Sequence, residues 1–182
     1  VLAKFVDMKA MPTSGYSISG VIEKSYSGGA KFQQNDVLLA RITPCLENGK
    51  TGLVDFLVNE EVGFGSTEFI VLRAKGNIGF GFVACLARYD DFRAHCILNM
   101  VGSSGRQRVQ NSCFDSFHLA LPKDDLVLAF FEKMVSAHFS KATSNKLVTS
   151  SLVKLRDTLL PKLISGELQI PEAEKLTAEA LN

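Results

Sequence analysis

The feature that most constrains this chain is a long segment that contains neither glycine nor proline. Lys123–Leu160 runs for 38 residues without either one, whereas residues 1–122 are interrupted repeatedly by both. A continuous α-helix of that length would extend ~57 Å, which is longer than the diameter of a small domain. Asp124 and Asp125 supply acceptors and negative charge where a helix N-terminus favours them. We therefore predict a compact domain followed by a long helix that serves as a spacer or an oligomerisation arm.

Residues 1–122 have the pattern of short strands separated by turns, with two helices among them. The candidate strands are apolar-rich and bounded by turn residues, and they are Asp36–Ile42, Thr67–Arg73 and, more weakly, Gly52–Val58 and Ser116–Leu121. In Ile78–Tyr89 and Asp91–Met100 the apolar residues are too closely spaced for alternating strands, so we expect helices there. Because strands and helices do not alternate regularly, the predicted fold class is α+β rather than a doubly wound sheet.

The long segment is apolar at its two ends and polar in its middle, at His138, Lys141 and Asn145. A uniform coiled coil would keep the middle apolar, so we expect the first end to pack on the domain and the last end to pack elsewhere. Ser165-Gly166 is a helix stop signal. The predicted domains are a globular domain at 1–122, a long helix of coiled-coil type at 123–168 and a flexible tail at 169–182.

Composition excludes several classes of function. The formal net charge is +1, so any nucleic-acid contact must come from locally clustered basic residues or from a partner. The four cysteines are 40, 11 and 17 residues apart, which fits neither a zinc site nor a redox CxxC motif, and the three histidines are scattered. We predict no metal site and no catalytic residues. Free thiols, with no long apolar run and no leader pattern, favour a cytoplasmic protein.

The segment Thr43–Lys50 contains a cysteine, a carboxylate, an amide and an ammonium group, and it directly follows the predicted strand Asp36–Ile42. Catalysis by Cys45 is disfavoured because no histidine lies within 44 residues to serve as its base. Two other interpretations stay open. Asn48 and Gly49 could supply the positive φ angles of a tight hairpin turn, or Asn48 and Lys50 could be polar tips on a rigid loop, suited to base edges and phosphate.

Gly102–Arg108 is the most basic and glycine-rich stretch of the chain. It is either a solvated loop or an anion-binding loop in which serines donate to phosphate and arginines contact phosphate or guanine. It is not a Walker loop, because the Gly-Lys-Ser/Thr ending is missing. The chain has 13 Phe and no Trp, which suits core packing better than stacking on single-stranded nucleic acid.

Three segments in this order, Thr43–Lys50, Gly65–Phe69 and Arg156–Leu168, with the basic loop between the second and third, resemble the specificity subunits of type I restriction-modification systems. The resemblance implies a target recognition domain that reads double-stranded DNA, followed by one conserved-region helix, without catalytic activity. It implies a methyltransferase subunit and a restriction subunit as partners. S-adenosylmethionine, ATP and Mg would then reside on those partners, and no cofactor is expected in this chain.

The resemblance and the motifs together give two sets of candidate residues. The candidate DNA-binding residues are Arg41, Thr43, Asn48, Lys50, Ser66, Thr67, Ser103, Ser104, Arg106, Gln107 and Arg108. The candidate subunit-interface residues are Leu152, Leu155, Leu159, Leu160, Leu163 and Ile164.

The number of domains leaves two arrangements open. Members of the family carry two recognition domains and two such helices, whereas one of each is present here. The chain is then either a piece of a longer subunit or a half-subunit that dimerises through its helix. A different class of function also remains: the near-neutral charge and the polar helix middle suit a coiled-coil scaffold whose globular head binds protein.

Overall fold

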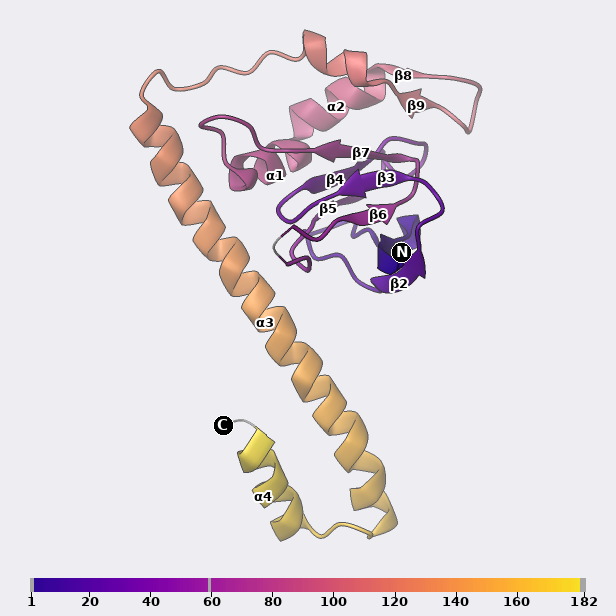
Figure 1. Ribbon diagram of the computed structural model, residues 1–182, viewed down its shortest axis with the longest axis vertical. Helices are drawn as coiled ribbons and strands as arrows, with labels where there is room; N and C mark the ends of the chain where they lie inside the picture. Colours follow the sequence, from indigo (N-terminus) through magenta and orange to yellow (C-terminus); the bar gives the residue numbers. More distant parts are fainter. Residues whose placement is uncertain (1, 59, 181–182) are drawn as a thin grey trace. The chain divides into compact units, whose positions relative to one another are not determined.

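The computed structural model describes residues 2–58 and 60–180, and the chain forms two compact units, residues 1–137 and 138–182 (Figure 1). Its strands are β1 (Leu2–Val6), β2 (Ile22–Ser25), β3 (Ala30–Phe32), β4 (Val37–Ala40), β5 (Thr51–Leu53), β6 (Gly63–Gly65), β7 (Phe69–Leu72), β8 (Met100–Val101) and β9 (Arg108–Val109). Its helices are α1 (Phe80–Arg88), α2 (Asp90–Leu98), α3 (Asp125–Ser165) and α4 (Ile170–Ala180), with short 3-10 turns η1 (Met8–Ala10) and η2 (Asn111–Ser116). The predicted α+β class is confirmed.

The strands form two small sheets and a hairpin. The first sheet has the order β2-β1-β6-β3, in which β1 runs parallel to β6 and the other neighbours are antiparallel. The second sheet has the order β5-β4-β7 and is antiparallel throughout. The β8–β9 hairpin carries the Gly102–Gln107 loop at its end. Every sheet therefore joins strands that are distant in sequence, which is typical of an α+β domain.

Strand β4 separates two hydrophobic cores, and this explains its continuous apolar sequence. Leu38 packs in a first core with Val6, Phe32 and Phe69, whereas Leu39 packs in a second core. That second core adds Leu46, Phe92, Cys96 and Val109 from the surrounding loop, α2 and β9. Successive side chains of a strand point to opposite faces, so a strand buried on both faces needs apolar residues at every position.

The first turns of α3 pack on α1 within the first unit, as the sequence predicted. Leu128 is buried, and the rings of Phe82 and Phe131 meet edge to face with centroids 6.1 Å apart. The Glu132 carboxylate accepts hydrogen bonds from the backbone N–H groups of Gly81 (3.0 Å) and Phe82 (3.1 Å). Since α1 has no capping side chain of its own, Glu132 supplies acceptors that the first turn of that helix lacks.

Helix α3 begins and ends where the sequence signals indicate. The Asp124 carboxylate accepts a hydrogen bond from the Leu126 amide at the N-terminus. At the other end Gly166 adopts φ 74°, a left-handed conformation that favours glycine. The helix passes through Pro161, whose ring nitrogen cannot donate the usual intrahelical hydrogen bond.

Three local predictions need correction. Residues 169–182, predicted as a flexible tail, contain helix α4, which begins with proline in its first turn, a position that proline tolerates. Ser116–Leu121 is not a strand; Phe117 packs on Phe92, and the segment pairs with no strand in the described part of the chain. The strand predicted at Gly52–Val58 is shorter and is limited to β5.

Candidate nucleic-acid interface

Three segments that are far apart in sequence meet beside the β8–β9 hairpin. The Thr43 amide donates to the Gln107 carbonyl at 3.0 Å, and Ile42 forms an isolated β-bridge with Arg108. The Arg41 amide donates to the Glu68 carbonyl at 3.0 Å, which joins the β6–β7 connection to the same cluster. The motif loops at 41–50, 66–68 and 102–108 therefore form one structural unit, although no sequence pattern predicted contacts among them.

Arg108 is held in an ion pair with Glu68. Its Nε lies 2.9 Å from both carboxylate oxygens of Glu68, and its Nη2 lies 2.7 Å from Oε1. The hydrogen bonds to Glu68 raise the pKa of Arg108 above its ordinary value. Because Nε and Nη2 already donate to Glu68, a contact between Arg108 and DNA would use the remaining N–H groups of the guanidinium or open this pair.

Three further candidates bind backbone carbonyls of the fold. The Arg41 guanidinium donates to the Val109 carbonyl through Nε (3.0 Å) and Nη2 (2.6 Å), and Nη2 also reaches the Gln110 side chain. Lys50 Nζ donates to the Met8 carbonyl at 2.9 Å, and Thr43 Oγ1 donates to the Gln107 carbonyl at 3.1 Å. These side chains fix the positions of the loops, which is a role that the sequence analysis did not assign to them.

The remaining candidates lie on or near the surface of the same cluster. The exposed ones are Asn48, Thr67, Ser103, Ser104 and Arg106. Ser66 is half-buried and its hydroxyl accepts from the Glu68 amide at 3.1 Å, while Gln107 is half-buried and offers its carbonyl to Thr43. Five polar side chains from three loops are thus available to a ligand, and Arg106 is the one cation among them.

The turn at Asn48-Gly49 differs from a two-residue hairpin turn. Gly49 has φ 70°, but among the described residues Asn35 is the one non-glycine residue with positive φ, so Asn48 does not share that conformation. The whole segment 41–50 connects β4 to β5, contains a cis Thr43-Pro44 peptide bond, and closes with the Asn48 amide donating to the Pro44 carbonyl at 2.9 Å.

Arg88 of α1 organises this loop and was missed as a functional residue. Its guanidinium donates to the carbonyls of Thr51 (2.8 Å), Thr13 (3.1 Å) and Gly49 (3.2 Å). It also lies over the ring of Tyr16, 5.0 Å from the centroid. Burial lowers the pKa of Arg88. A basic residue at the end of an amphipathic helix was the available signal, but its targets are backbone atoms that no sequence motif marks.

Three of the four cysteines, Cys85, Cys96 and Cys113, lie in surroundings that do not suit a nucleophile. Burial raises the pKa of the Cys96 thiol to about 12, and burial also raises the pKa of Cys85 and Cys113. A thiol that stays protonated at neutral pH is a poor nucleophile. No cluster of His, Cys, Asp and Glu suited to a metal ion occurs among the residues that the structure describes.

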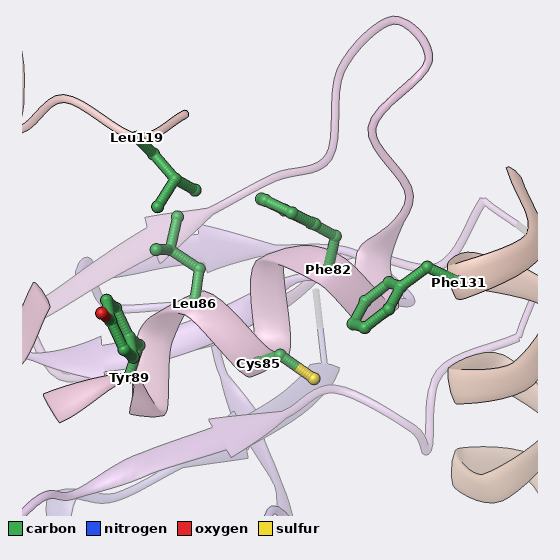
Figure 2. A pocket seen from close by; sticks show the side chains of 6 residues that line it. All are labelled: Phe82, Cys85, Leu86, Tyr89, Leu119 and Phe131. Carbon is green, nitrogen blue, oxygen red and sulfur yellow. The ribbon is translucent and has the colours of Figure 1, made fainter. Parts of the chain in front are cut away.

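An apolar pocket of 240 Å³ lies where α1 and the first turns of α3 meet (Figure 2). Its lining consists of Phe82, Cys85, Leu86, Tyr89, Leu119 and Phe131. The pocket offers hydrogen-bonding groups only at its edge, and none of the candidate DNA-binding residues lines it. It is separate from the loop cluster and lacks the polar groups that a catalytic site would need.

The six candidate interface residues all lie on the part of α3 that belongs to the second unit. Leu152, Leu160 and Ile164 are exposed, at 44%, 50% and 78%, and Leu155, Leu159 and Leu163 are half-buried. None of them is buried, so their apolar surface is available for an association. No helix in the described part of the chain is both long and apolar enough to cross a membrane.

Comparisons with known proteins agree with the motifs. No protein-family model matches the sequence. The chain is 30% identical over 104 residues to the EcoEI specificity subunit of a type I restriction enzyme from Escherichia coli, a match that covers 57% of this chain and 17% of that protein. It is 27% identical over 118 residues to the EcoAI specificity subunit from the same organism, covering 62% of this chain and 19% of the relative. The chain is also 31% identical over 67 residues to the HindI specificity subunit of Haemophilus influenzae, a match that covers 37% of this chain and 14% of that protein.

These matches each span less than a fifth of the relative's length. A solved structure from work on complex assembly and conformational transition of the type I R-M system has the same fold over 94% of this chain and 44% of its own, with a TM-score of 0.57 and 18% sequence identity. These matches confirm the resemblance inferred from the motifs: the chain is similar in sequence to the specificity subunits of type I restriction enzymes, and in fold to a chain from a type I R-M system.

Proposed function

We propose that this chain is the sequence-reading DNA subunit of a type I restriction-modification complex and that it performs no catalysis itself. The observation that carries the proposal is the loop cluster: three motif loops from distant parts of the sequence join, and apart from Pro44 their exposed side chains are polar. The similarity to specificity subunits supports this function for the loop cluster. In that function the chain directs an adenine methyltransferase and a nuclease/translocase to a bipartite DNA site.

The exposed groups suit base edges and phosphates. Arg106 can donate two hydrogen bonds to guanine, which contributes about 1–3 kcal/mol of discrimination against another base. The Asn48 amide matches adenine, and the hydroxyls of Ser103, Ser104 and Thr67 match phosphate. Because the chain has a net charge of +1, most phosphate contacts fall to the partner subunits, which also hold S-adenosylmethionine, ATP and Mg.

Helix α3 sets the distance between two recognition domains in this proposal. Its 41 residues correspond to about 62 Å of helix, or at most roughly 18 base pairs of B-form DNA. A second copy joined through Leu152–Ile164 would supply the other half-site, and a two-fold dimer would read a palindromic bipartite sequence. Solution mass separates this arrangement from a piece of a longer subunit, because only the half-subunit forms a dimer.

The test is methylation sequencing of a host that expresses this chain with its methyltransferase subunit. Arg106→Ala is expected to abolish or redirect adenine methylation at one defined motif. Lys75→Ala is the matched control, because it removes one exposed positive charge outside the loop cluster and is expected to leave methylation unchanged. Unaltered methylation with Arg106→Ala contradicts the assignment of the contact. If the assembled complex binds no specific DNA sequence with salt-dependent affinity, the whole proposal is wrong, and the alternative of a coiled-coil scaffold takes its place.

A further inference from the structure

Glu68 places a negative charge inside a loop cluster whose proposed ligand is a polyanion. Its side chain is 24% exposed, and that of its partner Arg108 is 40% exposed. Arg108 Nη2 lies 2.7 Å from Oε1 of the carboxylate, and Nε lies 2.9 Å from both of its oxygens. A carboxylate at a DNA-binding surface repels phosphate, so the place of Glu68 is best explained by its effect on Arg108.

Main-chain hydrogen bonds fix the two segments that carry this ion pair. The Glu68 amide donates to Ser66 Oγ at 3.1 Å, and the Glu68 carbonyl accepts from the Arg41 amide at 3.0 Å. The Arg41 carbonyl accepts from the amide of Val109, the residue after Arg108, at 2.9 Å. The backbone of Arg41 therefore connects the segment of Glu68 with the segment of Arg108.

The guanidinium of Arg108 also contacts the loop that carries Arg106. Its Nη1 donates to the main-chain carbonyl of Arg106 at 3.2 Å. The Arg106 amide closes a turn by donating to the Ser103 carbonyl at 3.0 Å, while the Arg106 side chain is exposed. Contacts therefore run from Glu68 through Arg108 to the main chain that presents the exposed side chain of Arg106.

The ion pair also neutralises one of the two positive charges in the basic stretch Gly102–Arg108. The N–H groups of Arg108 that remain available belong to a pair without net charge, which attracts phosphate weakly. A cation that meets phosphate releases counterions and increases the affinity for DNA of any sequence. Such sequence-independent affinity reduces the preference of a protein for its target over other DNA. Glu68 is therefore placed to limit this affinity.

We propose that Glu68 is a positioning and specificity-determining residue, which fixes the loop of Arg106 through Arg108 and keeps the charge of Arg108 from non-target DNA; this inference rests on the proposed function. Loss of the Glu68 charge then has two effects of opposite sign. Arg106 loses its fixed position, so the affinity for the target falls. Arg108 becomes free to contact phosphate, so the affinity for other DNA rises. A residue with only a structural role would lower both affinities.

The test uses the full chain assembled with its methyltransferase subunit and two duplex DNA probes of equal length. One probe contains the motif found by methylation sequencing, and the other is a random sequence without it. Glu68→Gln is expected to weaken binding to the target probe about tenfold and to strengthen binding to the random probe about threefold, measured by fluorescence anisotropy. For the random probe, the slope of log K against log salt concentration should become steeper by about 0.9, the value for one added phosphate contact.

Two control variants separate the ion pair from a general effect of charge. Glu47→Gln removes an exposed carboxylate from the same loop cluster and leaves the pair of Glu68 and Arg108 intact, so the salt slope should stay unchanged. In an Arg108→Gln background, Glu68→Gln should no longer strengthen binding to the random probe, because no arginine is released. Unfolding curves verify that each variant retains the fold. As a measurement on the wild-type chain, phenylglyoxal should modify Arg106 faster than Arg108.

Each contrary result has a distinct meaning. If the wild-type complex does not prefer the target probe to the random probe, the proposed function fails together with the role of Glu68. If the wild-type complex prefers its target and Glu68→Gln changes neither affinity, only the role of Glu68 is wrong. If Glu68→Gln lowers both affinities, the residue is purely structural. Stronger binding to the random probe that persists in the Arg108→Gln background, or equal modification of the two arginines, also overturns the inference.

Discussion

Strand β4 and helix α3 use their apolar side chains in opposite ways. All four residues of β4 are buried, whereas Leu128 is the one buried residue among the 41 of α3 in the described structure. The apolar side chains of β4 are thus buried in the cores of its own domain. The helix retains apolar residues such as Leu147, 65% exposed, that this chain does not cover. The difference shows that β4 contributes to the hydrophobic cores of the domain, whereas most of the apolar side chains of α3 contribute to no core among the described residues.

The largest effect is expected in the strand. Leu38→Ala should lower the free energy of unfolding by about 2–5 kcal/mol, because Leu38 is fully buried in the first core and its removal leaves a cavity. The matched control is Leu147→Ala in α3, which should change stability by less than about 0.5 kcal/mol. Urea unfolding measures both values, and equal losses in the two variants would remove the contrast between strand and helix.

An intermediate effect is expected where α3 does attach to the domain. Glu132→Gln should lower stability by about 1–2 kcal/mol, because Gly81 and Phe82 donate to different carboxylate oxygens and the NH2 group of glutamine cannot accept the second of these hydrogen bonds. Hydrogen exchange should accelerate in α1 and in the first turns of α3. Glu174→Gln, an exposed change in α4, is the control. Unchanged exchange in α1 would show that the cap does not hold the two helices together.

The smallest effect on stability is expected at the far end of α3, where the effect on association is large. Leu152→Asp should change the free energy of unfolding of the monomer by less than about 1 kcal/mol, because the side chain is 44% exposed and aspartate has a modestly lower helix propensity than leucine. It should convert a dimer of this chain into a monomer, measured as solution mass by light scattering. If the wild-type chain is a monomer, the chain is better explained as a piece of a longer subunit. If the variant remains dimeric, the dimer contact does not involve Leu152.

Local patterns predicted the elements whose pattern is complete within one segment. β4, β7, α1, α2 and both ends of α3 follow from apolar spacing and capping residues, and all lie within two residues of their predicted positions or inside the predicted range. Strands of two to five residues such as β1, β6 and β8 were missed, because their partners are distant in sequence and a short run carries little periodicity.

In the candidate site, too, features within one segment could be predicted from the sequence, whereas contacts between distant segments could not. The motifs predicted a site on three loops, and the structure brings these loops together, but the motifs could not separate exposed side chains from those that hold the loops in place. Arg106 and Arg108 are two residues apart in one basic stretch, yet Arg106 is exposed and Arg108 is paired with Glu68. That pairing joins positions 40 residues apart, so only the tertiary structure reveals it.

The hydrogen bonds that fix the loop cluster have a consequence for how the DNA preference suggested under the proposed function could change. Arg88, Arg41, Lys50 and Thr43 all donate to main-chain carbonyls, which every amino acid possesses. Substitutions at Thr13 or Thr51 therefore leave these acceptors in place, and the same holds for most changes at the exposed loop tips. Exposed side chains of the loops can therefore be substituted one at a time, and the hydrogen bonds that hold the loops in place remain. A new DNA preference would then require a few surface substitutions and no redesign of the domain.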